Sequence, residues 1–280
     1  MIESPLPSLS AWVNALADAE IPVLPRTVAE LQQLREIEDT RGTVDANMLA
    51  DSLSADPLMT LTVLVHVSRY CTRLNIEPPE SLTGAILMLG ITPFFEAFNN
   101  IPTVIDWLTS EPEAVSGLLK VIVRARRSAH LAMNFALRRQ DEDAGIIHQA
   151  ALLHDFAEML LWCHAPKLAH DIAQRLQADH TLRSAAVQKV VLGTPLNAIA
   201  HQLMRVWQLP DMLIKCTDDR RAQDTQVRSV MLGVQIVRHT QHGWDAPHAQ
   251  AALHDDVSEV ARLLTLSHEA AERLLKAIDS

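Results

Sequence analysis

Apolar residues recur at helical spacing along almost the whole chain, and no segment alternates cleanly between apolar and polar residues. The first pattern is typical of helices that bury one face, whereas strict alternation would indicate strands. Glycine is also scarce, at 8 of 280 residues, which is less than half of the usual frequency of about 7%. Alanine and leucine, which favour helices, are abundant. The sequence therefore predicts an all-α protein and argues against a β-sandwich or a Rossmann-type sheet.

Prolines and capping residues mark where the helices begin and end. The segment 21–25 carries two prolines and is expected to be extended, because proline restricts its own backbone and that of the preceding residue. Pro112 is expected in the first turn of a long helix, and the segment 100–112 is expected to be a joint. We expect helices over residues 8–19, 26–38, 45–54, 57–72, 81–89, 92–99, 112–139, 143–154, 156–164, 166–178, 182–192, 195–207, 211–218, 224–241, 247–263 and 266–279.

The charge of the chain is acidic, with 24 Lys and Arg residues against 34 Asp and Glu residues and a formal net charge of −10. Sequence-independent binding of nucleic acid depends mainly on neutralising phosphates, so we expect no nucleic-acid partner. The N-terminus has no signal-peptide pattern, and no apolar run approaches the roughly 18 residues of a membrane span. We therefore expect a cytoplasmic protein with no membrane partner. The cysteines, Cys71, Cys163 and Cys216, are too far apart to suggest a disulfide framework or a thiolate zinc site.

The most informative dipeptide is His154-Asp155, which follows the apolar run Ala151–Leu153. An imidazole beside a carboxylate supplies two ligands that suit a divalent cation and its bound water. A catalytic metal would need further His or Asp ligands from other helices. The dipeptide occurs again at His254-Asp255, where more acidic residues follow and the pattern is typical of a solvated helix face. Because a buried carboxylate must be paired or bound, the apolar context favours Asp155 as the functional residue.

Five short motifs occur in an order that resembles one protein family. They are Ile21–Pro25; Ala55–Leu58, leading into an apolar helix through Arg69; Ser81–Gly90; Ala151–Ala157; and Trp207–Pro210. Together they resemble the HDOD family, the regulatory relatives of the HD-domain metal-dependent phosphohydrolases, over roughly residues 20–220. Both glycines of the family's GLLHDIG motif are alanine here. The resemblance implies a helical bundle of two packed lobes, about 20–110 and 112–220, and leaves 221–280 as a C-terminal helical extension packed on the second lobe.

The first departure from the family pattern concerns a histidine ligand. Metal-binding relatives have a histidine followed by serine, and counting from the downstream apolar positions puts Arg127-Ser128 at that place. A shift of three residues would offer His130 instead, but Asn134 would then fall where an apolar residue is needed, so we prefer Arg127. Arginine stays protonated and has no lone pair to donate, so it is not a practical metal ligand.

Two further ligand positions depart from the pattern. The resemblance puts Leu196 at the histidine that precedes the Trp-x-Leu-Pro signature by eleven residues, and Arg220-Arg221 at the histidine pair that follows it. Of the usual ligands, only His154 and Asp155 are present. We therefore expect no bound metal, no other cofactor and no catalytic residue in this vestigial HD site.

The arginines suggest what replaces the metal. We hypothesise that the Arg127 guanidinium lies beside Asp155 and supplies the neutralising charge; the alternative is that Asp155 caps a helix. Lys120, Arg124, Arg127 and Arg138 fall on one side of the helix 112–139. Of these, Lys120, Arg124 and Arg138 are candidates for contact with an anion or an acidic partner. The alternative for this stripe is a solvated face with intramolecular salt bridges.

The expected function follows from the resemblance and from the missing ligands. The resemblance implies a bacterial signal-transduction or regulatory module, and the lost ligands favour one that acts through protein contacts without catalysis. Relatives often accompany receiver or diguanylate-turnover domains. This chain has no room for such a domain, so we expect its partner to be a separate signalling protein of that kind.

Two alternatives remain open on the sequence. The first is a metal-dependent phosphohydrolase or phosphodiesterase that acts on a nucleotide or cyclic dinucleotide through His154 and Asp155, with His130 or His148 as an added ligand. The second is a sensor that binds a phosphorylated small molecule in the vestigial site, with Arg127, Arg220 and Arg221 in place of the metal.

Overall fold

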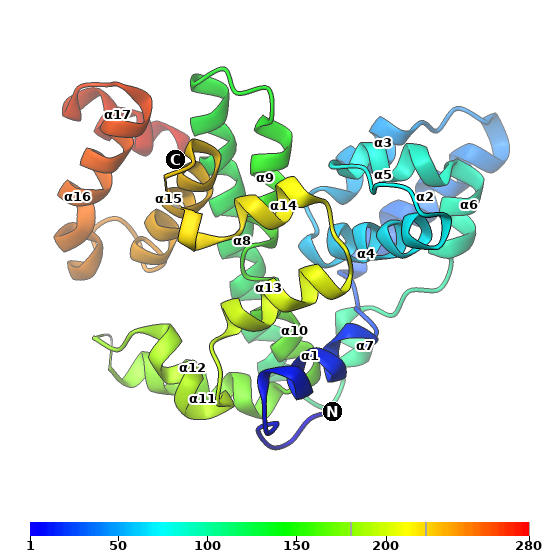
Figure 1. The fold of residues 1–280 in the computed structure, drawn as a ribbon, viewed down its shortest axis with the longest axis horizontal. Coiled ribbons are helices and arrows are strands. Elements are labelled where there is room, and N and C mark those ends of the chain that lie inside the picture. Colours follow the sequence, from blue (N-terminus) through cyan, green and yellow to red (C-terminus); the bar gives the residue numbers. More distant parts are fainter. Residues whose placement is uncertain (180, 222, 280) are drawn as a thin grey trace. The chain divides into compact units, whose positions relative to one another are not determined.

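A computed structural model describes residues 1–179, 181–221 and 223–279 of the chain, which form helices joined by short loops (Figure 1). Residues 180, 222 and 280, the last two within the expected extension 221–280, lie outside the described residues. The helices are α1 (Leu9–Ala17), α2 (Pro25–Arg41), α3 (Ala46–Leu53), α4 (Pro57–Leu74), α5 (Leu82–Leu89), α6 (Ile91–Ala97), α7 (Val104–Trp107), α8 (Pro112–Arg138), α9 (Ala144–Leu153), α10 (Phe156–His164), α11 (Pro166–Ala178), α12 (Ser184–Leu192), α13 (Leu196–Val206), α14 (Asp211–Cys216), the 3-10 helix η1 (Asp219–Arg221), α15 (Thr225–His239), α16 (Pro247–Leu264) and α17 (His268–Ile278).

The prediction of an all-α protein is confirmed, and the expected helices form with ends that differ by a few residues. The helix expected over 26–38 continues to Arg41, where Gly42 ends it in the left-handed region at φ 62° without the strain that a Cβ would bring. The helix α7 was not expected. It lies within the joint 100–112, and the Thr103 hydroxyl caps it by accepting a hydrogen bond from the Asp106 N–H. A single turn is too short to show helical periodicity in the sequence.

Contacts between helices divide the chain into two units. Unit 1 contains residues 1–122 and 155–210, and unit 2 contains residues 123–154 and the chain from Asp211 onward. The boundary crosses α8, whose first part belongs to unit 1 and whose second part belongs to unit 2. In this grouping, segment 155–210 joins the N-terminal helices and the C-terminal helices join 123–154. The lobes expected at 20–110 and 112–220 stay a prediction.

Asp56 fastens the start of α2 to the start of α4 in unit 1. Its side chain is almost fully buried, at 2% exposure. Oδ1 accepts hydrogen bonds from the backbone N–H groups of Leu58 and Met59 at 2.9 and 3.3 Å, which caps α4. Oδ2 accepts from the Leu24 N–H at 2.9 Å and from the Thr27 hydroxyl at 2.7 Å. The Asp-Pro-Leu motif is therefore a structural one.

The segment 21–25 is extended, as its two prolines predict, and it pairs with the joint before α7. Val23 donates its N–H to the Pro102 carbonyl at 2.9 Å, and its own carbonyl accepts from the Val104 N–H at 2.8 Å. Beyond this segment, α2, α3, α4, α5 and α6 gather into one group, with α5 in contact with α3, α4 and α6 (Figure 1).

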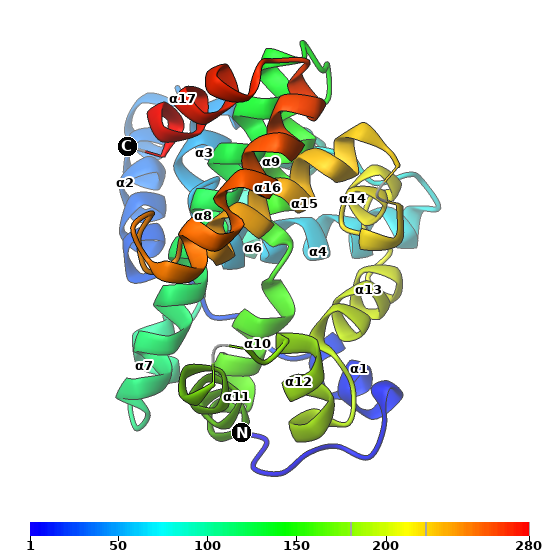
Figure 2. The same ribbon diagram turned by 90° about the vertical axis from the view of Figure 1, so that its left-hand side faces the viewer.

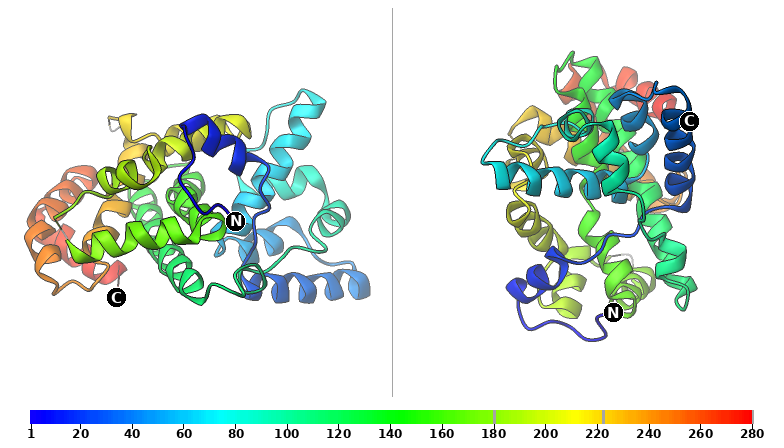
Figure 3. Two further views of the ribbon diagram at one scale, coloured as in Figure 1. Left: turned by 90° about the horizontal axis from the view of Figure 1, so that it is seen from below. Right: turned by 90° about the vertical axis from the view of Figure 1, so that its right-hand side faces the viewer.

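Two tryptophans join the first helix of unit 1 to segments far along the chain. The buried Trp12 donates its indole N–H to the Leu192 carbonyl at 3.1 Å. Trp207, from the Trp-x-Leu-Pro signature, donates to the Ala17 carbonyl at 2.8 Å. Its ring lies against Phe156 with centroids 5.7 Å apart. These bonds hold α1 beside α13, next to the hairpin of α11 and α12 (Figures 2 and 3).

Unit 2 is built around the contact between α8 and α15. Its core comprises Leu131, Phe135, Leu232, Ile236, Val237, Val257, Val260, Leu263, Ala271 and Leu275. Gly233 lets α15 approach α8 closely, because a Cβ at this position would lie 2.8 Å from the Ser128 carbonyl oxygen. On its other sides α15 contacts α9 and α16, and α16 contacts α17 (Figure 1). The C-terminal helices therefore share one core with the second half of α8.

Two further properties of the described helices concern membrane spanning and cysteine chemistry. None of these helices is both long and apolar enough to cross a membrane. Cys71, Cys163 and Cys216 are buried thiols. Burial, together with the smaller influence of the Asp56 charge, raises the pKa of the Cys163 thiol to about 12. A thiol in that state is a packing group and not a nucleophile, because reactivity depends on the thiolate.

Candidate functional site

His154 and Asp155 occupy the turn between α9 and α10. The first of these helices ends at Leu153 and the second begins at Phe156, so the dipeptide lies where the chain passes from unit 2 to unit 1. Both side chains are half-buried. Asp155 stands at the N-cap position of α10, but its side chain makes no capping hydrogen bond. The alternative that Asp155 serves as a helix cap is therefore not supported by the geometry of that turn.

The Arg127 guanidinium is directed to the C-terminal end of unit 2. Its Nε donates to Oδ1 of Asp279 at 3.1 Å and its Nη2 donates to Oδ2 at 2.5 Å, which makes a bidentate ion pair. Nη1 donates to the Thr240 carbonyl at 3.4 Å, and Nη2 also donates to the Thr240 hydroxyl at 3.0 Å. Each nitrogen of the guanidinium thus has a partner. This corrects the hypothesis that Arg127 neutralises Asp155, because the carboxylate that it neutralises is Asp279.

The Asp279 carboxylate is enclosed by its donors. Its side chain is 8% exposed, against 30% for Arg127, and the indole N–H of Trp244 adds a third donor, 2.9 Å from Oδ2. Burying a carboxylate without partners would be costly, and a bidentate guanidinium with one more N–H offsets that cost. Leu274 and Leu275 bury the same helix on its apolar side. The ion pair of Arg127 with Asp279 therefore holds the C-terminal end of α17 against α8.

The other positions that depart from the metal-binding pattern are also buried or paired. Leu196, in unit 1, is 6% exposed at the start of α13. Arg220, in unit 2, donates to both carboxylate oxygens of Asp218 at 2.8 and 3.0 Å. This hydrogen-bonded pair raises the pKa of Arg220. Arg221 is exposed. Neither Leu196 nor the two arginines can donate an electron pair to a metal.

His130 and His148, the added ligands of the enzyme alternative, lie on α8 and α9 of unit 2. His130 is exposed, and its Nε2 is 3.4 Å from Nδ2 of Asn134. Burial lowers the pKa of His148, and the charge of His130 lowers it further. Both effects favour the neutral form of His148, which is the form that a metal ligand requires.

The donor set of the vestigial site is too small for a divalent cation. Among the described residues, no group of three or more His, Cys, Asp or Glu side chains is arranged to hold a metal ion. The positions that would complete the set carry a leucine and three arginines, of which Arg127 and Arg220 are already paired with carboxylates. The residues present do not fit a catalytic divalent cation.

The basic stripe on α8 is interrupted in the structure. Lys120 and Arg138 are exposed, Arg124 is half-buried, and Arg127 turns inward. The same helix exposes three aliphatic side chains, Leu119, Val123 and Leu137, at 41%, 55% and 54%. Because exposed aliphatic groups beside basic ones are typical of protein-contact surfaces, this face of α8 retains features of a binding surface.

The helical architecture and the His-Asp turn place the chain among HD-like helical proteins. More specifically, the chain belongs to the HDOD domain family, because the family's sequence model matches residues 21–222. Two solved structures share the fold. The MmoQ response regulator from Methylococcus capsulatus is 19% identical with a TM-score of 0.60, covering 88% of this chain and 98% of that chain. A virulence factor from Campylobacter jejuni is 17% identical with a TM-score of 0.63, covering 96% and 92%. No curated protein sequence matches the chain.

Sequence reasoning missed the partners of Arg127. Asp279, Thr240 and Trp244 come from distant parts of the sequence, and no motif marks them. It also missed an apolar hollow between α11 and α12, lined in part by Leu182 and Val190. A signal for the hollow exists in the sequence, since Val190 falls on the polar face of a helix whose buried residues are Val187, Val191 and Leu192.

Proposed function

We propose that this HDOD protein is a non-catalytic signalling or regulatory module of the bacterial cytoplasm that acts through protein contacts. Its partner is a separate signalling protein, such as a receiver or a cyclic-dinucleotide-turnover protein. Membership of the HDOD family and the fold shared with a response regulator support the signalling role. The absence of catalysis is the further step, and it rests on the chemistry of the donor set.

The observation that carries the proposal is the pairing of Arg127. In the alignment of motifs this residue stands where metal-binding relatives have their first histidine, and here its guanidinium is bound by Asp279 and Thr240. A guanidinium at a ligand position cannot donate to a cation and repels one. At this position Arg127 forms a structural ion pair in place of a metal ligand. His154 and Asp155 alone are too few ligands for a catalytic metal.

Protein contacts also have a candidate surface. The exposed face of α8 combines Lys120 and Arg138 with Leu119, Val123 and Leu137. Such a face suits an acidic partner with apolar side chains of its own, because the basic groups guide encounter while the aliphatic groups are buried on binding.

The proposal is tested on the purified full-length protein. Metal content is measured by elemental analysis, and hydrolysis of bis(p-nitrophenyl) phosphate and of cyclic diguanylate is assayed with Mn²⁺ or Mg²⁺. We expect metal well below one equivalent per chain, and no turnover that separates the wild type from Asp155→Ala. The matched control is Asp255→Ala, which removes the exposed aspartate of the second His-Asp dipeptide.

The same experiment decides between the proposal and the enzyme alternative. Stoichiometric metal, with turnover lost in Asp155→Ala and kept in Asp255→Ala, would overturn the non-catalytic function. The lowered pKa of His148, which is caused mainly by burial, favours that alternative because a metal ligand must be neutral. If it is right, His148→Ala lowers metal content as well as turnover, since a metal ligand affects both.

A further inference from the structure

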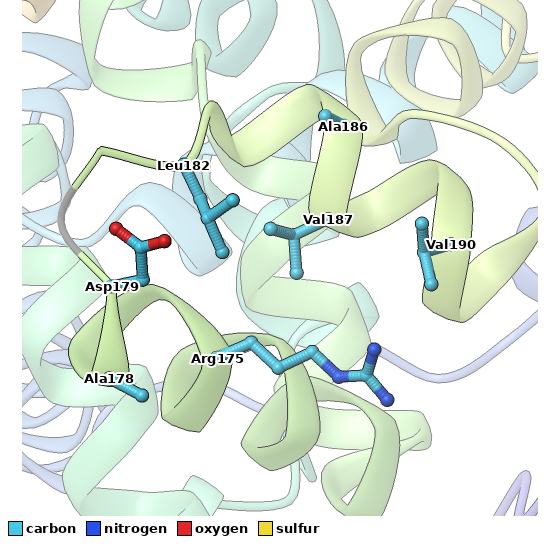
Figure 4. A pocket seen from close by; sticks show the side chains of 7 residues that line it. All are labelled: Arg175, Ala178, Asp179, Leu182, Ala186, Val187 and Val190. Atoms are coloured by element: carbon cyan, nitrogen blue, oxygen red, sulfur yellow. The ribbon is translucent and has the colours of Figure 1, made fainter.

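An apolar hollow lies between α11 and α12 in unit 1 (Figure 4), and none of the residues that line it belongs to the vestigial site. It is open to solvent and has a volume of about 360 Å³, which falls within the range of roughly 300–1,000 Å³ typical of small-molecule sites. The aliphatic wall consists of Ala178, Leu182, Ala186, Val187 and Val190. The hollow is therefore large enough for a small ligand and offers it an almost entirely hydrocarbon surface.

The wall of the hollow exposes aliphatic groups that the chain itself does not cover. Val190 is 73% exposed and Leu182 is 42% exposed, while Val187 between them is buried at 5%. Ala186 and Val190 lie four residues apart on one face of α12, and Leu182, in the loop just before this helix, continues their exposed aliphatic stripe along the hollow. Covering this stripe would remove apolar surface from water, which is favourable in proportion to the area buried.

The Arg175 side chain supplies a guanidinium at the edge of the hollow. Figure 4 shows the Arg175 side chain running from α11 toward the side on which Val190 lies. Its Nε donates to Oδ1 of Asp171 at 2.8 Å, which fixes the side chain. Neither Nη group donates a hydrogen bond to the described part of the chain, so both remain for an anion. The group is positioned by one carboxylate and has the donors to hold a second.

The charge around the hollow is positive although the whole chain is acidic. Arg183 and Lys189, next in sequence to Leu182 and Val190, are exposed and make no ion pair with the described residues. The Asp179 carboxylate at the other end of the hollow is used locally, where its Oδ1 accepts from the N–H and the hydroxyl of Thr181 at 2.9 and 2.6 Å. A cationic ligand would be repelled, whereas an anion would gain charge-assisted hydrogen bonds from the Nη groups, so the hollow suits an anion.

We propose that this hollow is a binding site for an aliphatic carboxylate of medium chain length. The hydrocarbon chain lies along Leu182, Ala186 and Val190, and the carboxylate accepts hydrogen bonds from the Nη groups of Arg175. The binding is non-covalent. The site lies outside the residues on which the proposed function rests, so it adds a small-molecule ligand to the module without depending on the absence of catalysis.

Titration of the full-length protein with hexanoate, octanoate and decanoate, followed by calorimetry and amide NMR, tests the site. Each methylene that enters the hollow raises affinity about 4-fold, because its burial contributes about 0.8 kcal/mol. The increase should stop once the hollow is filled. Octan-1-ol, which has the same chain without the charge, binds about tenfold more weakly than octanoate because it lacks the charge-assisted hydrogen bonds.

Two variants and two matched controls locate the binding. Val190→Glu puts a carboxylate on the rim and lowers octanoate affinity at least tenfold, while Val206→Glu changes a 55% exposed valine of α13 in the same unit and leaves it unchanged. Arg175→Gln weakens octanoate about tenfold and leaves octan-1-ol unchanged, with Arg205→Gln as its control. All four positions are solvent-accessible, so the variants should fold.

Three outcomes would overturn the assignment. They are the absence of saturable binding by decanoate at millimolar concentration, equal affinity of octanoate and octan-1-ol, and binding that Val190→Glu leaves unchanged. In the first outcome the exposed stripe is a surface for a protein partner and not a ligand site. None of these outcomes affects the metal and turnover measurements, so failure of this site is distinguishable from failure of the proposed function.

Discussion

Asp56 in unit 1 and Asp279 in unit 2 are both buried carboxylates, and they are stabilised in opposite ways. Asp56 accepts four hydrogen bonds, three from backbone N–H groups and one from a hydroxyl, all of them neutral donors. Asp279 accepts from a guanidinium and an indole. The first arrangement arises mainly from an Asp-Pro motif at the start of a helix, and the second from a pair separated by 152 residues. The comparison shows that a local polar network can be recognised as a motif, while a long-range ion pair cannot.

The largest expected effect comes from removing the carboxylate with neutral donors. Asp56→Ala leaves three N–H groups and the Thr27 hydroxyl without an acceptor, and we expect a loss of about 4 kcal/mol in the free energy of unfolding, from the lost cap and the unsatisfied buried donors. The control is Asp45→Ala at the exposed cap of α3, where one N–H loses its partner, with an expected loss of about 1 kcal/mol.

Urea unfolding and hydrogen exchange measure the Asp56 effect. Exchange should rise in α2 and α4, the two helices that Asp56 joins. Equal losses of unfolding free energy in Asp56→Ala and Asp45→Ala would contradict the prediction. So would exchange that rises first in unit 2, because Asp56 would then not hold the helices of unit 1 together.

The second prediction concerns the charged pair. Asp279→Asn and Arg127→Gln should each destabilise the protein by about 2 kcal/mol, because each leaves a partly buried charge without its partner. The double variant should lose much less than the sum of the two single losses, with a coupling energy of about 2 kcal/mol. The surface pair of Arg175 and Asp171, whose side chains are 48% and 40% exposed, is the control, with an expected coupling of about 0.5 kcal/mol. Additive losses at Arg127 and Asp279 would mean that the two residues are not energetically coupled.

The contrast between the two aspartates also explains which parts of the fold and the site could be predicted from the sequence. Helical periodicity and caps, such as Asp45 and Asp56, are encoded within a few residues, so nearly every helix was predicted. The single turn α7 was not, since four residues contain no full period. The motif comparison identified the family and the loss of ligands, but it paired Arg127 with the wrong carboxylate. The true partner depends on how α17 packs, which no local pattern encodes.

The smallest expected effect compares two histidines, one in each unit. His164 in unit 1 is 8% exposed, and its Nε2 has no hydrogen-bond partner in the described structure. Burial lowers the pKa of His164, as it does for His148 in unit 2. Each histidine therefore binds a proton more readily in the unfolded chain, so its neutral form supports the fold at neutral pH. Stability is lost as pH falls below the unfolded pKa of about 6.5, by at most about 1.4 kcal/mol per pH unit for each residue.

The test is urea unfolding at pH values from 7.5 to 5.5 in the wild type and in His164→Gln, His148→Gln and the exposed control His254→Gln. The first two variants should each flatten the loss of stability below pH 6.5, and the control should keep it. Hydrogen exchange distinguishes the two units, because His164→Gln should change exchange in α10 and His148→Gln should change exchange in α9. A slope that both variants retain would contradict the prediction, because the acid sensitivity would then arise outside these two histidines.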